Sequence, residues 1–124
     1  PSIWDTSIMW PWQSVACRPE VVRLPGRIKV FFVQTTNGHD AAYSVGHTLA
    51  QRYGNGERIY VSDEARFDTL AHELGHVLLD HHGERGDDDH VNDSANLMHG
   101  IGRLLPNLTQ KQVDAMRVTA QRLA

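Results

Sequence analysis

Residues 69–82, which read TLAHELGHVLLDHH, are the stretch around which the chain is organised. His72 and His76 are four residues apart, so on a helix they lie about 40° apart around the axis and one turn along it. Both imidazoles can then reach one ion, and Glu73 can contact a water molecule that the ion holds. This is the H-E-x-x-H pattern of two zinc ligands and a general base. The stretch therefore predicts a Zn²⁺ site on one helix face.

A solvated, charged helix face is the simpler explanation, because a bare H-E-x-x-H can arise by chance. The residues around the motif are apolar: Leu70, Ala71, Leu74, Val77 and Leu78. Apolar flanks indicate a helix that is buried in a core, with the His-Glu-His set aimed inward. Buried polar groups without partners are costly, and a metal ion is a suitable partner for this set.

The composition indicates one soluble globular domain. The chain has 124 residues, of which 40% are hydrophobic and 22% charged, so it has room for one modest core. A net charge of -3 does not indicate a basic surface for binding nucleic acid. The sequence contains no run of 18 apolar residues, so membrane insertion is not expected. The single cysteine, Cys17, excludes an internal disulfide and is expected to be a packed, free thiol. The start at Pro1 fits a mature fragment, a domain of a longer protein or loss of the initiator Met, which leaves localisation undecided.

The first half of the chain predicts an irregular arm and three strands. Residues 1–26 contain all three tryptophans and show no clean period, so we expect an irregular, Trp-rich arm packed on the domain. Residues 27–34 are β-branched and aromatic and predict a buried strand. A short edge strand is expected within 39–47, and a second short strand over 58–61.

Two helices complete the expected fold. Ser62 or Asp63 should cap a long helix that runs from about Glu64, with His81 and His82 in its last turn. Gly83 suits the C′ position of that helix.

Near the end of the chain, Thr109 and Gln112 form a capping-box pattern that begins a closing helix. The expected fold class is α+β, with a small mixed β-sheet packed on a long active-site helix and a C-terminal helix. A single domain should span residues 1–124.

The third metal ligand is open from the residues alone, and a catalytic zinc usually has three. The candidates are His82, His90, Glu84 and the run 87–89. If the helix continues to Gly83, His82 lies about 9 Å further along the axis than His76 and cannot share its ion. His82 would serve only if the chain bent near Leu79, and Leu is a poor residue for the left-handed conformation. The acidic run 87–89 favours a solvated loop or a weak second cation site.

With these motifs, the chain resembles the metzincin clan of zinc peptidases, most of all its matrixin-like branch and small bacterial relatives. Residues 90–98 read HVNDSANLM, with the His-to-Met spacing of matrixins and an Asp at the same third step. The resemblance implies that His90 is the third ligand, after an insertion of eight residues, and that Met98 is the Met-turn under the ligands. His82 remains the alternative third ligand, and a carboxylate would make the site similar to a gluzincin.

The resemblance covers about residues 27–123, with specific motifs only in 69–76 and 90–98. His99 and Gly100 follow the Met, so the Tyr that some metzincins place two residues after it is absent. The family also usually has a long helix and two more strands ahead of the first strand here, which residues 1–26 do not supply.

The resemblance implies a zinc-dependent endopeptidase that acts on peptide or protein substrates, with Glu73 as general base. The substrate cleft is expected alongside an edge strand near 41–45. A secreted or exported location is favoured by the same resemblance. One alternative is a metallopeptidase toxin or effector module of a larger secreted protein, restrained by an inhibitor or immunity protein. Another is a non-catalytic metal-binding interaction domain.

Overall fold

The computed structural model describes residues 14–36, 41–46, 50, 56–80, 89–100 and 103–123. It contains three strands: β1 (Ile28–Phe32), β2 (Ala42–Val45) and β3 (Glu57–Val61). The two longer helices are α3 (Thr69–Leu79) and α4 (Gln110–Leu123), and two short helical turns precede the strands, η2 (Ser14–Cys17) and α1 (Pro19–Val22). The predicted α+β class with a small mixed sheet is confirmed.

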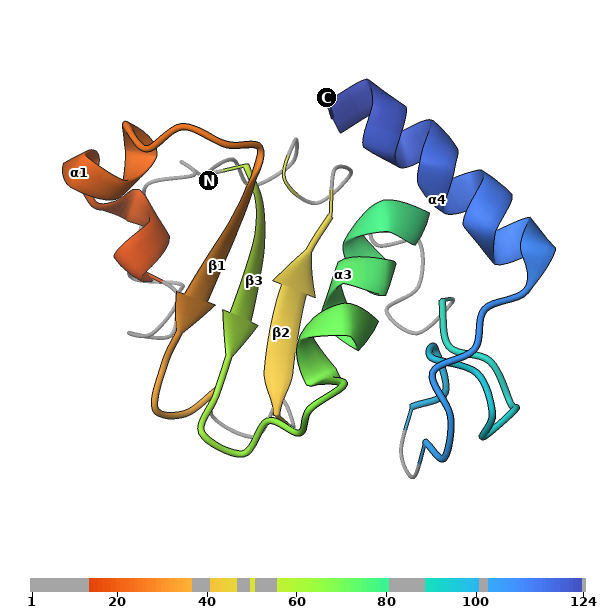
Figure 1. Cartoon of the computed structure of the whole chain (residues 1–124). Coiled ribbons are helices and arrows are strands. Elements are labelled where there is room, and N and C mark those ends of the chain that lie inside the picture. The colour runs from red at the N-terminus through yellow and green to blue at the C-terminus, as the bar shows by residue number, and fades with distance from the viewer. Residues whose placement is uncertain are drawn as a thin grey trace.

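The sheet has the strand order β1-β3-β2 (Figure 1). β1 is parallel to the central strand β3, and β2 is antiparallel to it. Ile59 and Val61 of β3 form a core cluster with Val77 of α3 and Leu123 of α4. α3 packs against β2 and β3, and α4 packs against α3. The sheet and the closing helix therefore hold α3 between them.

A strand does form within residues 27–34, but the prediction that it is buried is wrong. β1 lies at one edge of the described sheet, and Phe32 at its end is 78% exposed. An apolar run cannot distinguish a central strand from an edge strand. The central position belongs to β3, all of whose residues are buried. The short edge strand expected within 39–47 is confirmed as β2 at the opposite edge of this sheet.

The arm over residues 1–26 is only partly described. Its three tryptophans lie at positions 4, 10 and 12, outside the described residues. Residues 14–17 and 19–22 form helical turns where an irregular chain was expected. Pro19 stands at the start of α1, where its fixed φ and missing N–H suit a first helical turn.

α3 is shorter than predicted at its start. Ser62 does not begin the helix but closes a turn, in which its Oγ accepts the N–H of Glu64 at 3.3 Å and its carbonyl accepts that of Ala65 at 3.1 Å. The helix begins at Thr69, after Asp68. Arg66 donates its N–H to Thr69 Oγ1 at 2.8 Å, which completes the connection.

The expected helix end at Gly83 is also wrong. α3 ends at Leu79, and Asp80 adopts the left-handed conformation with a φ of 53°. The short polar side chain of Asp tolerates that conformation better than most residues do. Arg122 of α4 holds it there by donating to Asp80 Oδ2 at 3.0 Å. The bend that a ligand at His82 would require is therefore present, although residues 81–88 lie outside the described part of the chain.

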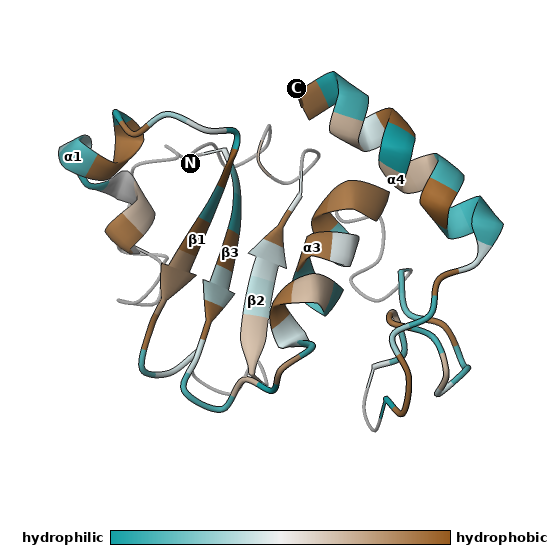
Figure 2. Cartoon of the chain, in the orientation of Figure 1, coloured by the Kyte–Doolittle hydropathy of each residue, from teal (hydrophilic) through white to brown (hydrophobic). Residues whose placement is uncertain are grey.

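The start of α4 matches its prediction. Gln112 donates its backbone N–H to Thr109 Oγ1 at 3.2 Å, and Thr109 donates its own to Gln112 Oε1 at 2.8 Å. This reciprocal pair is the capping box. Figure 2 shows hydrophobic and hydrophilic residues alternating along α4, as expected of a helix with one face on the core.

None of the helices described here has the length and apolar character needed to cross a membrane.

Candidate metal centre

His72 and His76 project from one buried face of α3. They are 6% and 5% exposed, and their Nε2 atoms lie 3.0 Å apart. This is the juxtaposition that a four-residue spacing on a helix produces. Glu73, next to His72 on the same turn, is 8% exposed. The helix therefore buries two adjacent imidazoles and, one residue along from the first of them, a carboxylate.

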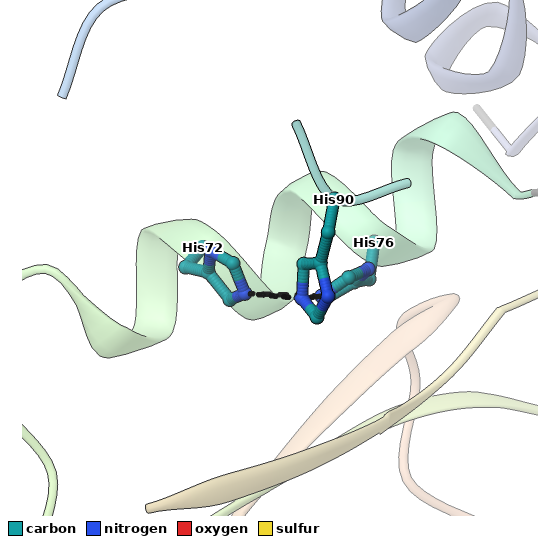
Figure 3. Close-up of side chains that lie close together, drawn as sticks. All are labelled: His72, His76 and His90. Carbon is teal, nitrogen blue, oxygen red and sulfur yellow. Dashed lines mark hydrogen bonds between the residues drawn. The ribbon is translucent and has the colours of Figure 1, made fainter. Parts of the chain in front are cut away.

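His90 comes from the segment 89–100 and meets the helical pair (Figure 3). Its Nε2 lies 3.2 Å from that of His72 and 3.0 Å from that of His76. His90 itself is exposed, so the group opens to solvent on its side. The three histidines lie close enough to bind one metal ion.

The triangle of ring nitrogens has the geometry of a shared ion. An N–H group points at one acceptor, so three mutually close nitrogens cannot all be joined by linear hydrogen bonds. Three imidazoles arranged tetrahedrally around one ion, with metal–nitrogen distances of about 2.0–2.1 Å, would have nitrogens about 3.3 Å apart. The observed separations of 3.0–3.2 Å are close to that value.

The partners of the other ring nitrogens direct the Nε2 lone pairs inward. His72 Nδ1 lies 2.7 Å from the carbonyl oxygen of Leu97, and His76 Nδ1 lies 3.0 Å from Asp89 Oδ2. A carbonyl and a carboxylate only accept hydrogen bonds, so both Nδ1 atoms carry the proton. Two Nε2 lone pairs then face each other across 3.0 Å, and a cation bound by both would relieve their repulsion.

Burial keeps His72 in the form that binds a metal. The pKa of His72 is lowered from 6.5 to about 4, mainly because burial removes its hydration; the hydrogen bond with Leu97 raises the pKa and the nearby His76 lowers it, both by less than burial does. At pH 7 the ring is therefore neutral. Only the neutral imidazole has a lone pair for a metal ion.

Met98 lies directly under the histidine-bearing turns of α3. Its side chain is fully buried, and a Cβ added at Gly75 would overlap Met98 Sδ and lie 3.2 Å from Met98 Cε. The absence of a side chain at Gly75 therefore gives Met98 the space to approach the helix. Met98 also packs with Leu97 and Met116 in a second core cluster.

A buried amide pair fastens the turn before Met98 to α4. Asn96 donates to Gln112 Oε1 at 2.8 Å, and Gln112 donates back to Asn96 Oδ1 at 3.1 Å. Asn96 Oδ1 also accepts the N–H of Met98 at 2.8 Å. Leu97 lies between Asn96 and Met98 in the chain. The amide pair of Asn96 and Gln112 therefore helps to fix the Leu97 carbonyl that bonds to His72.

Replacing Asn96 with Ala should lower the free energy of unfolding by about 1–3 kcal/mol, because buried groups of Gln112 and Met98 lose their partner. Urea denaturation measures this change. Gln110→Ala is the control, since its amide pairs with Asp114 on the surface and its loss should cost about 0.5 kcal/mol or less. Equal losses in the two variants would contradict a special role for the buried pair.

Arg103 joins the chain after Met98 to the start of α3. Its Nε and Nη2 donate to the two carboxylate oxygens of Asp68 at 3.0 and 3.2 Å. Its Nη1 donates to the carbonyls of His99 and Gly100, each at 3.0 Å. The hydrogen bond from Arg103 holds the pKa of Asp68 below its usual value. The sequence offered no signal for this pair, whose members are 35 residues apart.

Asp89 corrects the expectation of a solvated acidic loop over 87–89. It is 4% exposed, and its carboxylate binds His76. Asp87 and Asp88 lie outside the described residues, as do His82 and Glu84. The available signal was an acidic residue directly beside the expected third histidine.

No protein-family model matches this chain, and comparisons with curated proteins and with solved structures find no significant match either. The resemblance to metzincins stays a prediction that depends on the residues themselves.

Proposed function

We propose that this chain is a zinc-dependent endopeptidase of the metzincin type, with His72, His76 and His90 as zinc ligands and Glu73 as general base. The observation that supports the proposal is the set of three Nε2 atoms within 3.2 Å of one another, beside a buried glutamate on the same helix turn. The turn at Met98 would be the Met-turn of this family.

The donor set favours zinc in a catalytic rather than a structural role. Imidazole nitrogens suit Zn²⁺ among the common divalent ions, although copper, iron and nickel accept them too. Within the described residues the group contains only these three ligands, and three protein ligands with one open position are typical of catalytic zinc. When bound, zinc acidifies a water molecule and polarises a carbonyl group.

Glu73 supplies the proton transfer. Its position on α3 is about 100° around the axis from His72 and about 60° from His76, beside the ligands rather than opposite them. The carboxylate takes a proton from the attacking water and delivers it to the departing amine nitrogen of the peptide. The proton is conserved over the cycle. A purely structural metal site has no use for such a group, which argues against a non-catalytic metal-binding domain.

The sheet offers a place for an extended substrate. β2 forms the edge of the described sheet nearest α3, and α3 packs against it (Figure 1). An extended peptide can add to a sheet edge through main-chain hydrogen bonds. A peptide paired with β2 would pass near the helix that carries His72 and Glu73. This arrangement supports an endopeptidase, because main-chain pairing does not require a chain terminus.

A digestion assay tests the proposal. The zinc-loaded protein should cleave casein or members of a peptide library; 1,10-phenanthroline should abolish cleavage, and added Zn²⁺ should restore it. Peptide products are measured by mass spectrometry, which also reveals whether internal bonds are cut. A protein that binds one zinc per chain and cuts no peptide would contradict the proposal and leave a metal-binding domain.

A further inference from the structure

Asp89 and His90 are consecutive residues that contact opposite ends of one imidazole. Asp89 Oδ2 lies 3.0 Å from His76 Nδ1, and His90 Nε2 lies 3.0 Å from His76 Nε2. The chain therefore wraps around the edge of the His76 ring. Because the two residues are adjacent, the hydrogen bond between Asp89 and His76 also keeps His90 close to the His76 Nε2 atom.

We propose that Asp89 is a positioning residue of the metal centre, which fixes the orientation and tautomer of His76 and thereby preorganises His90 for binding the same ion. The inference rests on the metal site of the proposed function but not on proteolysis. It assigns to Asp89 a role that neither the H-E-x-x-H motif nor the spacing from His90 to Met98 contains.

The burial of Asp89 points to a positive charge nearby. Its side chain is 1% exposed, and that of His76 is 6% exposed. A buried carboxylate is costly unless a cation compensates it. A metal ion on His76 Nε2 would provide such a charge one imidazole ring away from the carboxylate. Asp89 and the bound metal should therefore stabilise each other.

The partner of His72 provides the contrast. His72 Nδ1 donates to the neutral carbonyl of Leu97, whereas His76 Nδ1 donates to a carboxylate. A carboxylate partner raises the basicity of the ligating imidazole more than a carbonyl does. Removing the hydrogen-bond partner of His76 Nδ1 should therefore lower the affinity for the metal more than removing the partner of His72 Nδ1.

Zinc affinity, measured without substrate by competition with a chromophoric chelator, tests the inference. Asp89→Asn keeps the size and an acceptor oxygen but removes the charge, and we expect it to weaken zinc binding about 10- to 100-fold. Asp89→Ala should weaken it at least as much, and Asp89→Glu should bind zinc more tightly than Asp89→Asn. The control is Asp93→Asn, an exposed acid in the same segment, whose expected change is less than about twofold.

The outcomes separate this inference from the proposed function. A wild-type protein that binds no zinc would overturn both, whereas equal zinc affinity in wild type and Asp89→Asn would overturn only the role of Asp89. If the variants do not fold, a measurement on the wild-type protein can test the role of Asp89 instead. Nuclear magnetic resonance of the zinc-loaded protein should find a slowly exchanging proton on His76 Nδ1, and a metal-bound or deprotonated Nδ1 would refute the assignment.

Discussion

Replacing Glu73 with Gln should leave zinc bound and lower kcat/KM for peptide hydrolysis by about 10²- to 10⁴-fold. Gln has nearly the same size as Glu and is neutral, so the buried position should tolerate it. An amide, however, cannot take a proton from water at neutral pH. The loss should therefore appear in turnover, with little change in metal content.

Zinc content and activity must be measured on the same preparation for this prediction. Glu64→Gln is the matched control, because Glu64 is an exposed carboxylate in the turn ahead of α3. It should match the wild type in both measurements. An unchanged turnover rate in Glu73→Gln would exclude the role of general base and favour a metal centre that does not hydrolyse peptides.

Local patterns were predictable because their causes are local. The pair His72 and His76 follows from the helical repeat, and the capping box at Thr109 and Gln112 follows from a spacing of three residues. Each feature needs only the knowledge that a helix forms there. The α+β class followed in the same way, from a few apolar runs and helical stretches.

The ends of α3 were not predictable, because residues distant in sequence determine them. Asp80 ends the helix in a left-handed conformation, and its carboxylate is held by Arg122, 42 residues further along the chain. Asp68 precedes the helix and binds Arg103, 35 residues away. The local signal at Gly83 gave the wrong end, because the helix ends earlier, at Leu79, with Asp80 in the left-handed conformation.

Two sequence features favoured His90 as the third ligand, and the structure contradicts the premise of one of them. Excluding His82 by its distance along the axis required a continuous helix to Gly83, and the bend at Asp80 ends the helix before that point. The spacing from His90 to Met98 has a physical basis, since Val91 donates its N–H to the carbonyl of Met98 at 3.1 Å. His99 Nδ1 also bonds the carbonyl of Val91 at 3.0 Å. These two bonds close the segment from Val91 to His99 into a loop, so the number of residues between His90 and Met98 is fixed by the loop.

If zinc binds at the three histidines as proposed, replacing His90 with Ala should abolish the stabilisation that the ion gives the fold. Zinc at a thousandfold excess over its Kd adds about 4 kcal/mol to the free energy of unfolding of a protein that binds it only when folded. With two ligands left on α3, the affinity should fall until this gain disappears. Thermal unfolding with and without zinc, together with measured zinc content, gives the result.

The same experiment distinguishes a ligand from a packing residue. His90 is exposed, so in the presence of a chelator His90→Ala and wild type should unfold at nearly the same temperature. They should diverge only when zinc is added. His82→Ala is the matched control and should respond to zinc as the wild type does. The opposite result, in which His82→Ala loses zinc and His90→Ala keeps its full zinc content, would make His82 the third ligand. His90 would then lie close to His72 and His76 without binding the ion.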